Sequence, residues 1–385
     1  MPLSRRLRRP VRLALSIVVL ALLALPALAG PRARDLGVPF KGTPGPLNAI
    51  TDVRGVEVGH ATVISGDTVR TGVTAILPRG KGSSDQVFAG WDALNGNGEM
   101  TGTAWVREGG FLAGPILITN THSVGAVHTA AIEWGTRRFP AEAKEAIFSL
   151  PVVAETWDGF LNDIFGFHVR KEHVFQALDG ASSAAVAEGN VGGGTGMIAY
   201  EYKGGIGTSS RRVSAEEGGY TVGVLVQSNH GRRNRLTIAG VPVGEEISGL
   251  LPRPGKAPEG DGSIIVVVAT DAPLLPHQLT RLARRAALGI GRVGGVGENS
   301  SGDILLAFST ANPGAAVPEG IVSLAMLPND RMDPLMQATV DATEEAIVNA
   351  MIAAETMTGV NGNTVYALPH DRLREILKKY NRLVP

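Results

Sequence analysis

The sequence predicts an α/β protein in which β-sheets are covered by helices. Short apolar or alternating runs bounded by glycine recur along the chain, as is typical of strands. Three longer segments repeat apolar residues with the helical period, and several predicted strands lead directly into them. Fifty glycines without a triplet period, in a chain that is 44% hydrophobic, indicate many tight turns around a large core.

The predicted strands share this short glycine-bounded pattern and comprise residues 56–63, 72–76, 114–118, 181–187, 220–226, 263–270 and 303–309. The predicted helices comprise residues 124–137, 274–288 and 340–356. The last of them carries Asp341, Glu344 and Glu345 in its first turns, where negative charge favours the helix dipole.

Residues 1–29 have the pattern of a secretory signal. Five arginines precede an apolar run from Leu13 to Leu25, and Pro26-Ala27-Leu28-Ala29 provides an Ala-x-Ala cleavage site. The run of about 13 apolar residues is shorter than the roughly 20 that span a membrane. We therefore expect cleavage after Ala29, a periplasmic or secreted protein, and no stable membrane insertion.

Composition argues against several classes of function. Without residues 1–29 the chain has five more acidic than basic residues, and it has no basic patch with interleaved aromatics, so nucleic acid is not an expected partner. The absence of cysteine excludes disulfides, thiolate metal sites and a cysteine nucleophile. His60, His122 and His230 are far apart in sequence, and the glycine-rich segment 189–196 lacks a P-loop ending, so we expect neither a metal nor an organic cofactor.

The most informative feature is the junction between Gly262 and Ser263. Residues 252–262 are rich in proline and glycine and should form an exposed linker, whereas residues 264–268 are an unbroken β-branched run typical of a strand buried on both faces. A Gly-Ser pair before a strand is by itself an ordinary turn. Chemically, however, the hydroxyl can attack the preceding carbonyl, and hydrolysis of the resulting ester frees an amine that can serve as a base for the same hydroxyl.

We therefore consider Ser263 a candidate for both self-cleavage and catalysis. The residues that follow Gly262 contain two predicted strands and two predicted helices, too little sheet for an independent domain. We expect one catalytic domain, residues 30–385, made of two interlocked pieces, 30–262 and 263–385.

Four motifs occur in order: ITDVRGVEVGH from Ile50, PVVAETWDG from Pro151, VQSNHG from Val226 and GSIIVVVATD from Gly262. With them the chain, from about residue 45 to 368, resembles the DmpA-type L-aminopeptidase and D-amidase/esterase family, to which β-aminopeptidases and nylon-oligomer endohydrolases are related. The resemblance implies a four-layer α-β-β-α sandwich, similar in layering to the N-terminal nucleophile hydrolases. It also implies a homo-oligomer, a tetramer of processed pairs.

The resemblance assigns roles to particular residues. Ser263 becomes the nucleophile at the start of the smaller subunit, and the Asn229 side-chain amide stabilises the oxyanion. Glu155 receives the free ammonium of the substrate, which makes the enzyme an exopeptidase acting on amino termini. Ser301 relays or orients the hydroxyl proton, and Asp303 holds the ammonium form of the new amino terminus.

Alternatives remain open for several of these residues. Asp158 is a rival to Glu155, and either carboxylate fits the cap of a helix beginning near Gly159. Trp157 stands where some family members have tyrosine as a second oxyanion donor; its indole N–H can donate, or the ring can simply line the pocket. Ser300 is an alternative to Ser301.

The predicted function is that of a self-processing serine aminopeptidase acting on short peptides, amides or esters with a free amino terminus. One alternative is an acyltransferase similar to the ornithine acetyltransferases, against which Ser263 and the export signal argue, because that group uses threonine and amino-acid biosynthesis is cytoplasmic. The other is an uncleaved extracytoplasmic binding protein in which Ser263 is a turn residue. The preference among L-α, D-α and β-amino residues depends on pocket shape and stays open.

Overall fold

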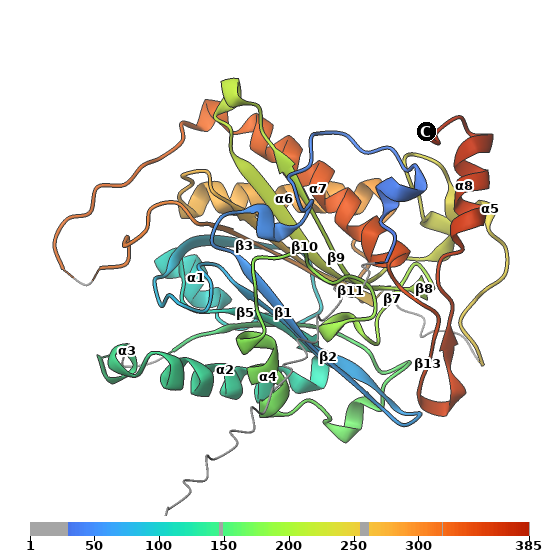
Figure 1. Cartoon of the computed structure of the whole chain (residues 1–385), viewed down its shortest axis with the longest axis horizontal. Helices are drawn as coiled ribbons and strands as arrows, with labels where there is room; N and C mark the ends of the chain where they lie inside the picture. The colour runs from blue at the N-terminus through green and yellow to red at the C-terminus, as the bar shows by residue number, and fades with distance from the viewer. Residues whose placement is uncertain (1–29, 146–148, 255–261, 318, 385) are drawn as a thin grey trace, which may run out of the picture.

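A computed structural model describes residues 30–145, 149–254, 262–317 and 319–384 (Figure 1). Two sheets face each other, and each is covered on its outer face by a pair of helices (Figure 1). Helices α6 (Pro276–Arg292) and α7 (Asp333–Ile352) cover the six-stranded sheet, and α2 (Val124–Arg138) and α4 (Lys171–Asp179) cover the four-stranded sheet. The predicted four-layer α-β-β-α fold is confirmed.

The four-stranded sheet has the order β1-β2-β5-β6. Its strands are β1 (Glu57–Ser65), β2 (Val69–Leu77), β5 (Ile116–Asn120) and β6 (Val152–Thr156). Strands β5 and β6 are parallel, and Thr119 lies opposite Glu155. The carboxyl ends of these two strands therefore meet at one edge of the sheet.

The six-stranded sheet has the order β4-β3-β12-β11-β10-β9. Its strands are β3 (Val87–Gly96), β4 (Phe111–Leu112), β9 (Gly205–Arg212), β10 (Thr221–His230), β11 (Gly262–Thr270) and β12 (Gly302–Ser309). The two central strands, β11 and β12, are parallel to each other, and they pair antiparallel with β10 and β3 respectively. The residues that follow Gly262 thus form the middle of a sheet whose flanks come from earlier in the chain.

Strand β11 is buried on both faces, which accounts for its unbroken β-branched run. Ile265 and Val267 point into the core between the two sheets, whereas Ile264 and Val266 pack in the core beneath α6 and α7. Because side chains alternate along a strand, Ser263 faces the layer between the sheets.

The remaining elements are short. They comprise α1 (Thr103–Gly109), α3 (Pro140–Glu145), α5 (Val243–Glu246), α8 (His370–Lys379), the hairpin of β7 (Ile198–Ala199) and β8 (Tyr202–Lys203), the hairpin of β13 (Met357–Thr358) and β14 (Thr364–Val365), and single 3-10 turns such as η3 (Thr121–Ser123) and η5 (Gly192–Gly194). In the described ranges no helix is both long and apolar enough to cross a membrane.

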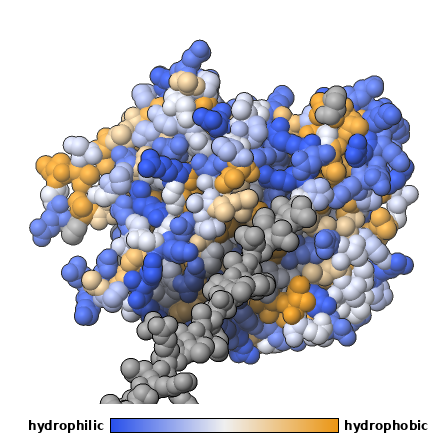
Figure 2. Space-filling model, in the orientation of Figure 1, coloured by the Kyte–Doolittle hydropathy of each residue, from blue (hydrophilic) through white to orange (hydrophobic). Residues whose placement is uncertain are grey.

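One segment between β12 and α7 projects from the body (orange, at the left of Figure 1). Its described apolar residues Ile321, Val322, Leu324 and Met326 are exposed, and Ile321 is 102% accessible. Figure 2 shows hydrophobic residues gathered at the same edge of the molecule. The described part of this projecting segment therefore presents apolar side chains to solvent.

Most predicted elements are present, with shifted ends. The predicted strands other than 181–187 overlap β1, β2, β5, β10, β11 and β12, and the predicted helices overlap α2, α6 and α7. The strand predicted at 181–187 is wrong: only a single bridge between Ser182 and Val58 forms, because most of this segment lies at the surface with nothing to bury its alanines. The predicted signal segment and residues 255–261 of the predicted linker lie outside the described residues.

Candidate active site

Ser263 is the second residue of β11, where the strand lies between two neighbours. Asn229 of β10 and Gly302 of β12 are its direct partners in the sheet. The backbone N–H of Gly302 donates a hydrogen bond to Ser263 Oγ at 3.1 Å, which orients the hydroxyl. Ser263 is 8% exposed, so the hydroxyl lies at the edge of the core rather than in open solvent.

Asn229 shares the inter-sheet face with Ser263, because directly opposed residues of antiparallel strands point to the same side. Its carboxamide is held at both ends. The N–H of Ile198 donates to Oδ1 at 2.7 Å, and Nδ2 donates to the Trp157 carbonyl at 3.0 Å. Nδ2 carries two hydrogens, and among the described residues only the Trp157 carbonyl accepts from it, so a second N–H can meet a ligand beside Ser263. A fixed donor in this position suits a developing oxyanion.

Glu155 lies near the end of β6 and is 4% exposed. The N–H of Glu99 donates to Oε1 at 3.0 Å, and the Thr121 hydroxyl donates to Oε2. Burial raises the pKa of the Glu155 carboxyl, and these two hydrogen bonds offset part of that shift. Within the described ranges no lysine or arginine contacts this carboxylate, so it is able to receive a cation from a ligand.

Two glycines bring Glu155 close to Ser263. A Cβ atom at Gly98 would lie 3.2 Å from both Glu155 Oε1 and Gly302 Cα, so the carboxylate and the residue that holds the Ser263 hydroxyl face the same small space. A Cβ atom at Gly302 would lie 2.6 Å from the Asn97 carbonyl oxygen. The absence of side chains here lets the loop after β3 cross directly beside the hydroxyl.

Gly262, the residue before Ser263, occupies a position that only glycine fits. Its φ is +61°, in the left-handed region that side chains disfavour. A Cβ atom there would lie 1.7 Å from the Asn229 carbonyl oxygen. Gly262 therefore has no side chain that could hinder attack on its carbonyl.

Ser301 and Asp303 flank Gly302 and bond to each other. The Ser301 hydroxyl donates to Asp303 Oδ1 at 2.5 Å. Burial raises the pKa of the Asp303 carboxyl, and the hydrogen bond from Ser301 and the backbone of Ile264 oppose that shift. In the part of the chain that the structure describes, neither side chain bonds to Ser263 Oγ. The pair therefore lies beside the backbone next to Ser263 rather than on the Ser263 hydroxyl.

Comparison with known proteins agrees with this arrangement. The model of peptidase family S58 matches residues 48–365. The chain belongs to peptidase family S58. Beta-peptidyl aminopeptidase BapA of Sphingosinicella microcystinivorans is 56% identical over 376 residues, with 92% of this chain and 93% of the relative covered. The protein of the same name from Sphingosinicella xenopeptidilytica is 54% identical over 386 residues, with 94% and 95% covered.

Among solved structures, the L-aminopeptidase D-Ala-esterase/amidase of Ochrobactrum anthropi, described as a prototype for the serine aminopeptidases with a variant Ntn hydrolase fold, superposes with a TM-score of 0.85. It is 50% identical, and the match covers 92% of this chain and 100% of that one. The protein is thus a self-processing serine aminopeptidase, as the sequence predicts, rather than an acyltransferase or an uncleaved binding protein.

Trp157 contacts the site through its backbone. Its carbonyl accepts from Asn229 Nδ2, while its ring is 38% exposed and lies over Gly159, where a Cβ atom would be 2.9 Å from Nε1. In the described residues the indole N–H makes no hydrogen bond within the protein. The ring therefore borders the site, and its role as an oxyanion donor stays a prediction.

Asp158 is buried among other partners than Glu155. Asn162 donates to its Oδ1 at 3.0 Å, and Oδ2 has no hydrogen-bond partner among the described residues. Burial raises the pKa of Asp158 to about 7. The helix considered at Gly159 is wrong: residues 158–162 form a turn closed by the Asp158 carbonyl.

Ser300 has no comparable contact. Its carbonyl accepts from the Asn97 side chain at 2.8 Å, and its residue is exposed, whereas the hydroxyl of Ser301 reaches Asp303. Of the two serines, Ser301 therefore has the geometry of a site residue.

The three histidines lie apart. His60 bonds to Thr74 at 3.0 Å, His122 packs against Phe165, and burial lowers the pKa of His230 to about 3. The described residues contain no group of three or more His, Cys, Asp or Glu side chains that could hold a metal ion. The glycine-rich segment is buried at η5, where Thr62 and Thr74 accept from its N–H groups, so it packs between the sheets instead of cradling a phosphate.

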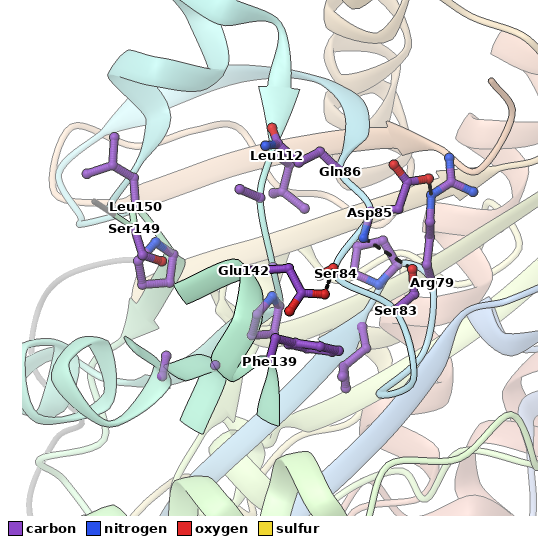
Figure 3. Close-up of a pocket in the computed structure, with 18 of the residues that line it drawn as sticks. Arg79, Ser83, Ser84, Asp85, Gln86, Leu112, Phe139, Glu142, Ser149 and Leu150 are labelled. Carbon is purple, nitrogen blue, oxygen red and sulfur yellow. Dashed lines mark hydrogen bonds and ion pairs between the residues drawn. The ribbon is translucent and has the colours of Figure 1, made fainter. Parts of the chain in front are cut away.

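A pocket of about 790 Å³ lies at the opposite end of the sheets from Ser263, near the start of β5 (Figure 3). Within the pocket, Arg79 contacts Asp85 at 3.0 Å, and Ser84 donates to Glu142 at 3.3 Å. None of the candidate active-site residues lines it. Size alone therefore does not mark the reacting centre of this molecule.

Thr121, Gly302 and Ile198 were not among the residues expected in the site. The position of Thr121 could have been predicted. It follows the predicted strand 114–118, and the carboxyl ends of parallel strands lie at one edge of a sheet, here beside Glu155. The contacts of Gly302 and Ile198 are made by backbone N–H groups, which the identity of a residue does not reveal.

The burial of Asp158 predicts a specific pH dependence of stability. Its folded-state pKa lies above the usual aspartate value, so the protonated form stabilises the folded chain at low pH and this contribution is lost as pH rises towards 7. The asparagine of the Asp158→Asn variant cannot ionise. The free energy of unfolding of Asp158→Asn relative to the parent should thus rise by about 2–3 kcal/mol between pH 5 and pH 8 in urea titrations.

The exposed Asp67→Asn serves as the control, because water surrounds that carboxylate before and after unfolding. A difference between Asp158→Asn and the parent that stays constant with pH would contradict the role of burial at Asp158.

Proposed function

We propose that Ser263 is the nucleophile, that it is freed by cleavage of its bond to Gly262, and that the enzyme removes amino-terminal residues from short peptides, amides and esters. One observation carries the proposal: the Ser263 hydroxyl and the Asn229 amide sit on directly paired residues, beside the buried Glu155 carboxylate, which no lysine or arginine of the described residues contacts.

Self-cleavage follows from the position of the hydroxyl. Ser263 Oγ attacks the carbonyl carbon of Gly262, the C–N bond breaks, and the hydroxyl proton passes to the nitrogen, so that an ester replaces the amide. Water then hydrolyses the ester, which leaves a carboxylate on Gly262 and both an amine and a hydroxyl on Ser263. The absence of a side chain at Gly262 favours this attack.

Turnover uses the same groups. The new α-amine, with a reference pKa of about 7.7–8.0, takes the hydroxyl proton as Oγ attacks the substrate carbonyl, and it returns the proton to the leaving amine. The free N–H of Asn229 Nδ2 stabilises the oxyanion, a contribution of about 3–4 kcal/mol in comparable sites. Water hydrolyses the acyl-enzyme in the second half of the cycle.

Asp303 and Ser301 act on the amine rather than on the hydroxyl in this scheme. The Asp303 carboxylate lies against the backbone of Ile264, the residue next to the new amino terminus, and is oriented by Ser301. A carboxylate so placed stabilises the ammonium form that arises when the amine takes up the proton.

Glu155 gives the enzyme its preference for amino termini. Among the described residues this buried carboxylate accepts hydrogen bonds from a backbone amide and a hydroxyl, and a substrate ammonium would complete its partners. The ammonium fixes the distance from the substrate's first residue to the nucleophile, so only the first bond of the substrate reaches Ser263. The exposed ring of Trp157 lines the approach.

We propose amino-terminal β-amino residues as the preferred substrates, because the relatives at 56% and 54% identity are named β-peptidyl aminopeptidases. A panel of aminoacyl p-nitroanilides with L-α, D-α and β-homo residues distinguishes the three classes by kcat/KM.

We propose export and self-association as well. Residues 1–29 have the pattern of a signal peptide cleaved after Ala29, which directs the chain to the periplasm or outside the cell. The projecting segment exposes Ile321, Leu324 and Met326, a surface that supports a homo-oligomer, a tetramer of cleaved pairs.

Replacement of Ser263 by alanine removes the hydroxyl proposed for both reactions. The variant is expected to migrate as one full-length chain and to lose kcat/KM by on the order of 10⁴ or more, measured by denaturing gel and amide hydrolysis. Cleavage or sustained turnover by Ser263→Ala would require a different nucleophile. The matched control is Ser300→Ala, a neighbouring exposed serine, which should be cleaved and active.

Replacement of Glu155 by glutamine keeps the shape and removes the charge that the substrate ammonium is expected to meet. We expect KM for substrates with a free amine to rise by about 10- to 100-fold, with a smaller change in kcat. Glu142→Gln, in the pocket at the other end of the sheets, should leave both constants unchanged. An unchanged KM in Glu155→Gln would contradict the role of Glu155.

A further inference from the structure

Lys203 is a completely buried lysine that the proposed mechanism does not use. It lies at the end of β8 and is 0% exposed. Its ammonium donates to three backbone carbonyls: Gly194 at 3.3 Å, Met197 at 2.9 Å and Gly204 at 2.9 Å. Three donors thus meet three acceptors. In the described residues no carboxylate pairs with it, and burial lowers the pKa of Lys203 to about 7.

The contact with Met197 connects this ammonium to the candidate oxyanion group. The Met197 carbonyl and the Ile198 N–H belong to the same peptide unit. The carbonyl accepts from Lys203 Nζ, while the N–H donates to Asn229 Oδ1 at 2.7 Å. Two hydrogen bonds therefore join the buried ammonium to the carboxamide of Asn229.

Hydrogen bonds in such a series strengthen one another, particularly in a site that excludes water. The ammonium withdraws electron density from the Met197 carbonyl, so the Ile198 N–H becomes a stronger donor. Asn229 Oδ1 is then more strongly polarised, which makes the Nδ2 hydrogens more acidic. At its other end Asn229 is held by the Trp157 carbonyl, so the carboxamide keeps one orientation.

We propose that Lys203 is a positioning residue for the oxyanion-binding amide, orienting and polarising Asn229 through the Met197–Ile198 peptide. The inference rests on the proposed function, because it assigns Lys203 an effect only through Asn229. It also accounts for a buried cation that no carboxylate of the described residues pairs with to offset its loss of hydration.

A purely structural role is the competing explanation, since the same contacts close the turn between η5 and β8. The two roles differ in what they change. If Lys203 only stabilises the turn, its loss lowers the stability of the protein and lowers activity whether or not Asn229 is present. If Lys203 polarises Asn229, its loss slows the chemical step only while Asn229 is present.

The test is a double-mutant cycle in the full-length protein with Lys203→Met, Asn229→Ala and the combination. For self-cleaved enzyme we expect Lys203→Met to lower kcat about 10-fold or more with KM little changed, and to have no further effect in the Asn229→Ala background. Equal losses in both backgrounds, or an unchanged kcat in Lys203→Met, would overturn the inference. If Asn229→Ala alone has full activity, the oxyanion role in the proposed function fails instead.

Lys81→Met is the matched control for the loss of a lysine that binds carbonyls. Lys81 Nζ donates to the carbonyls of Asp179 and Ala181 at 2.9 and 2.8 Å, beside the outer helix α4. This variant should leave kcat and KM unchanged.

A second measurement needs neither self-cleavage nor a change at Lys203. In the uncleaved Ser263→Ala protein, the Ile198 amide proton is followed by NMR between pH 5 and pH 9. It should move upfield as Lys203 loses its proton, and no movement would overturn the inference.

The titration is repeated in the Asp158→Asn background, because Asp158 packs against Gly196 and its pKa is also about 7. The pKa of His60 is about 4, and burial raises the pKa of Tyr202 above its usual value. Glu188 also has a pKa of about 7 and its neighbour Gly189 packs against Gly205, so Glu188→Gln is added to the same background. Arg233 lies over the Tyr202 ring and donates to the Glu201 carbonyl.

Discussion

The register of β11 between β10 and β12 is the constraint on which the site depends. It sets Ser263 opposite Asn229 on one side and opposite Gly302 on the other. A slip of one residue would turn Ser263 towards the helices and bring an isoleucine into the inter-sheet layer. The buried β-branched residues of β11 oppose such a slip, because every one of them would change faces. Core packing therefore holds the Ser263 hydroxyl in place.

Backbone groups supply much of the rest of the site. Three backbone N–H groups orient the three side chains: that of Gly302 orients Ser263, that of Ile198 orients Asn229, and that of Glu99 orients Glu155. Each comes from a different loop or strand end, and glycines at 98 and 302 let these segments approach closely. The two sheets meet at this edge, so the carboxylate of one sheet and the hydroxyl of the other face a common space without any direct bond between them.

Part of this arrangement is readable from the sequence. The Gly262–Ser263 junction is visible because flexible composition meets a β-branched run, and the layering follows from the alternation of strands and helices. Strand β9 could not be predicted from the sequence, because it is rich in glycine and polar residues. These polar side chains are buried beneath α7 through contacts such as the hydrogen bond from Ser209 Oγ to the Ala342 carbonyl. The pairing of Ser263 with Asn229 is a long-range contact that neither local pattern contains. Lys203 reads as an ordinary charged residue until its three carbonyl partners are known.

The central claim is that the bond before Ser263 is cut to produce the catalytic amino terminus. Intact-mass analysis of the purified wild-type protein under denaturing conditions tests it most directly. The account predicts two polypeptides, of which the smaller begins with Ser263 and comprises residues 263–385. A protein that hydrolyses amino-terminal residues while its mass shows one chain with the Gly262–Ser263 bond intact would contradict it.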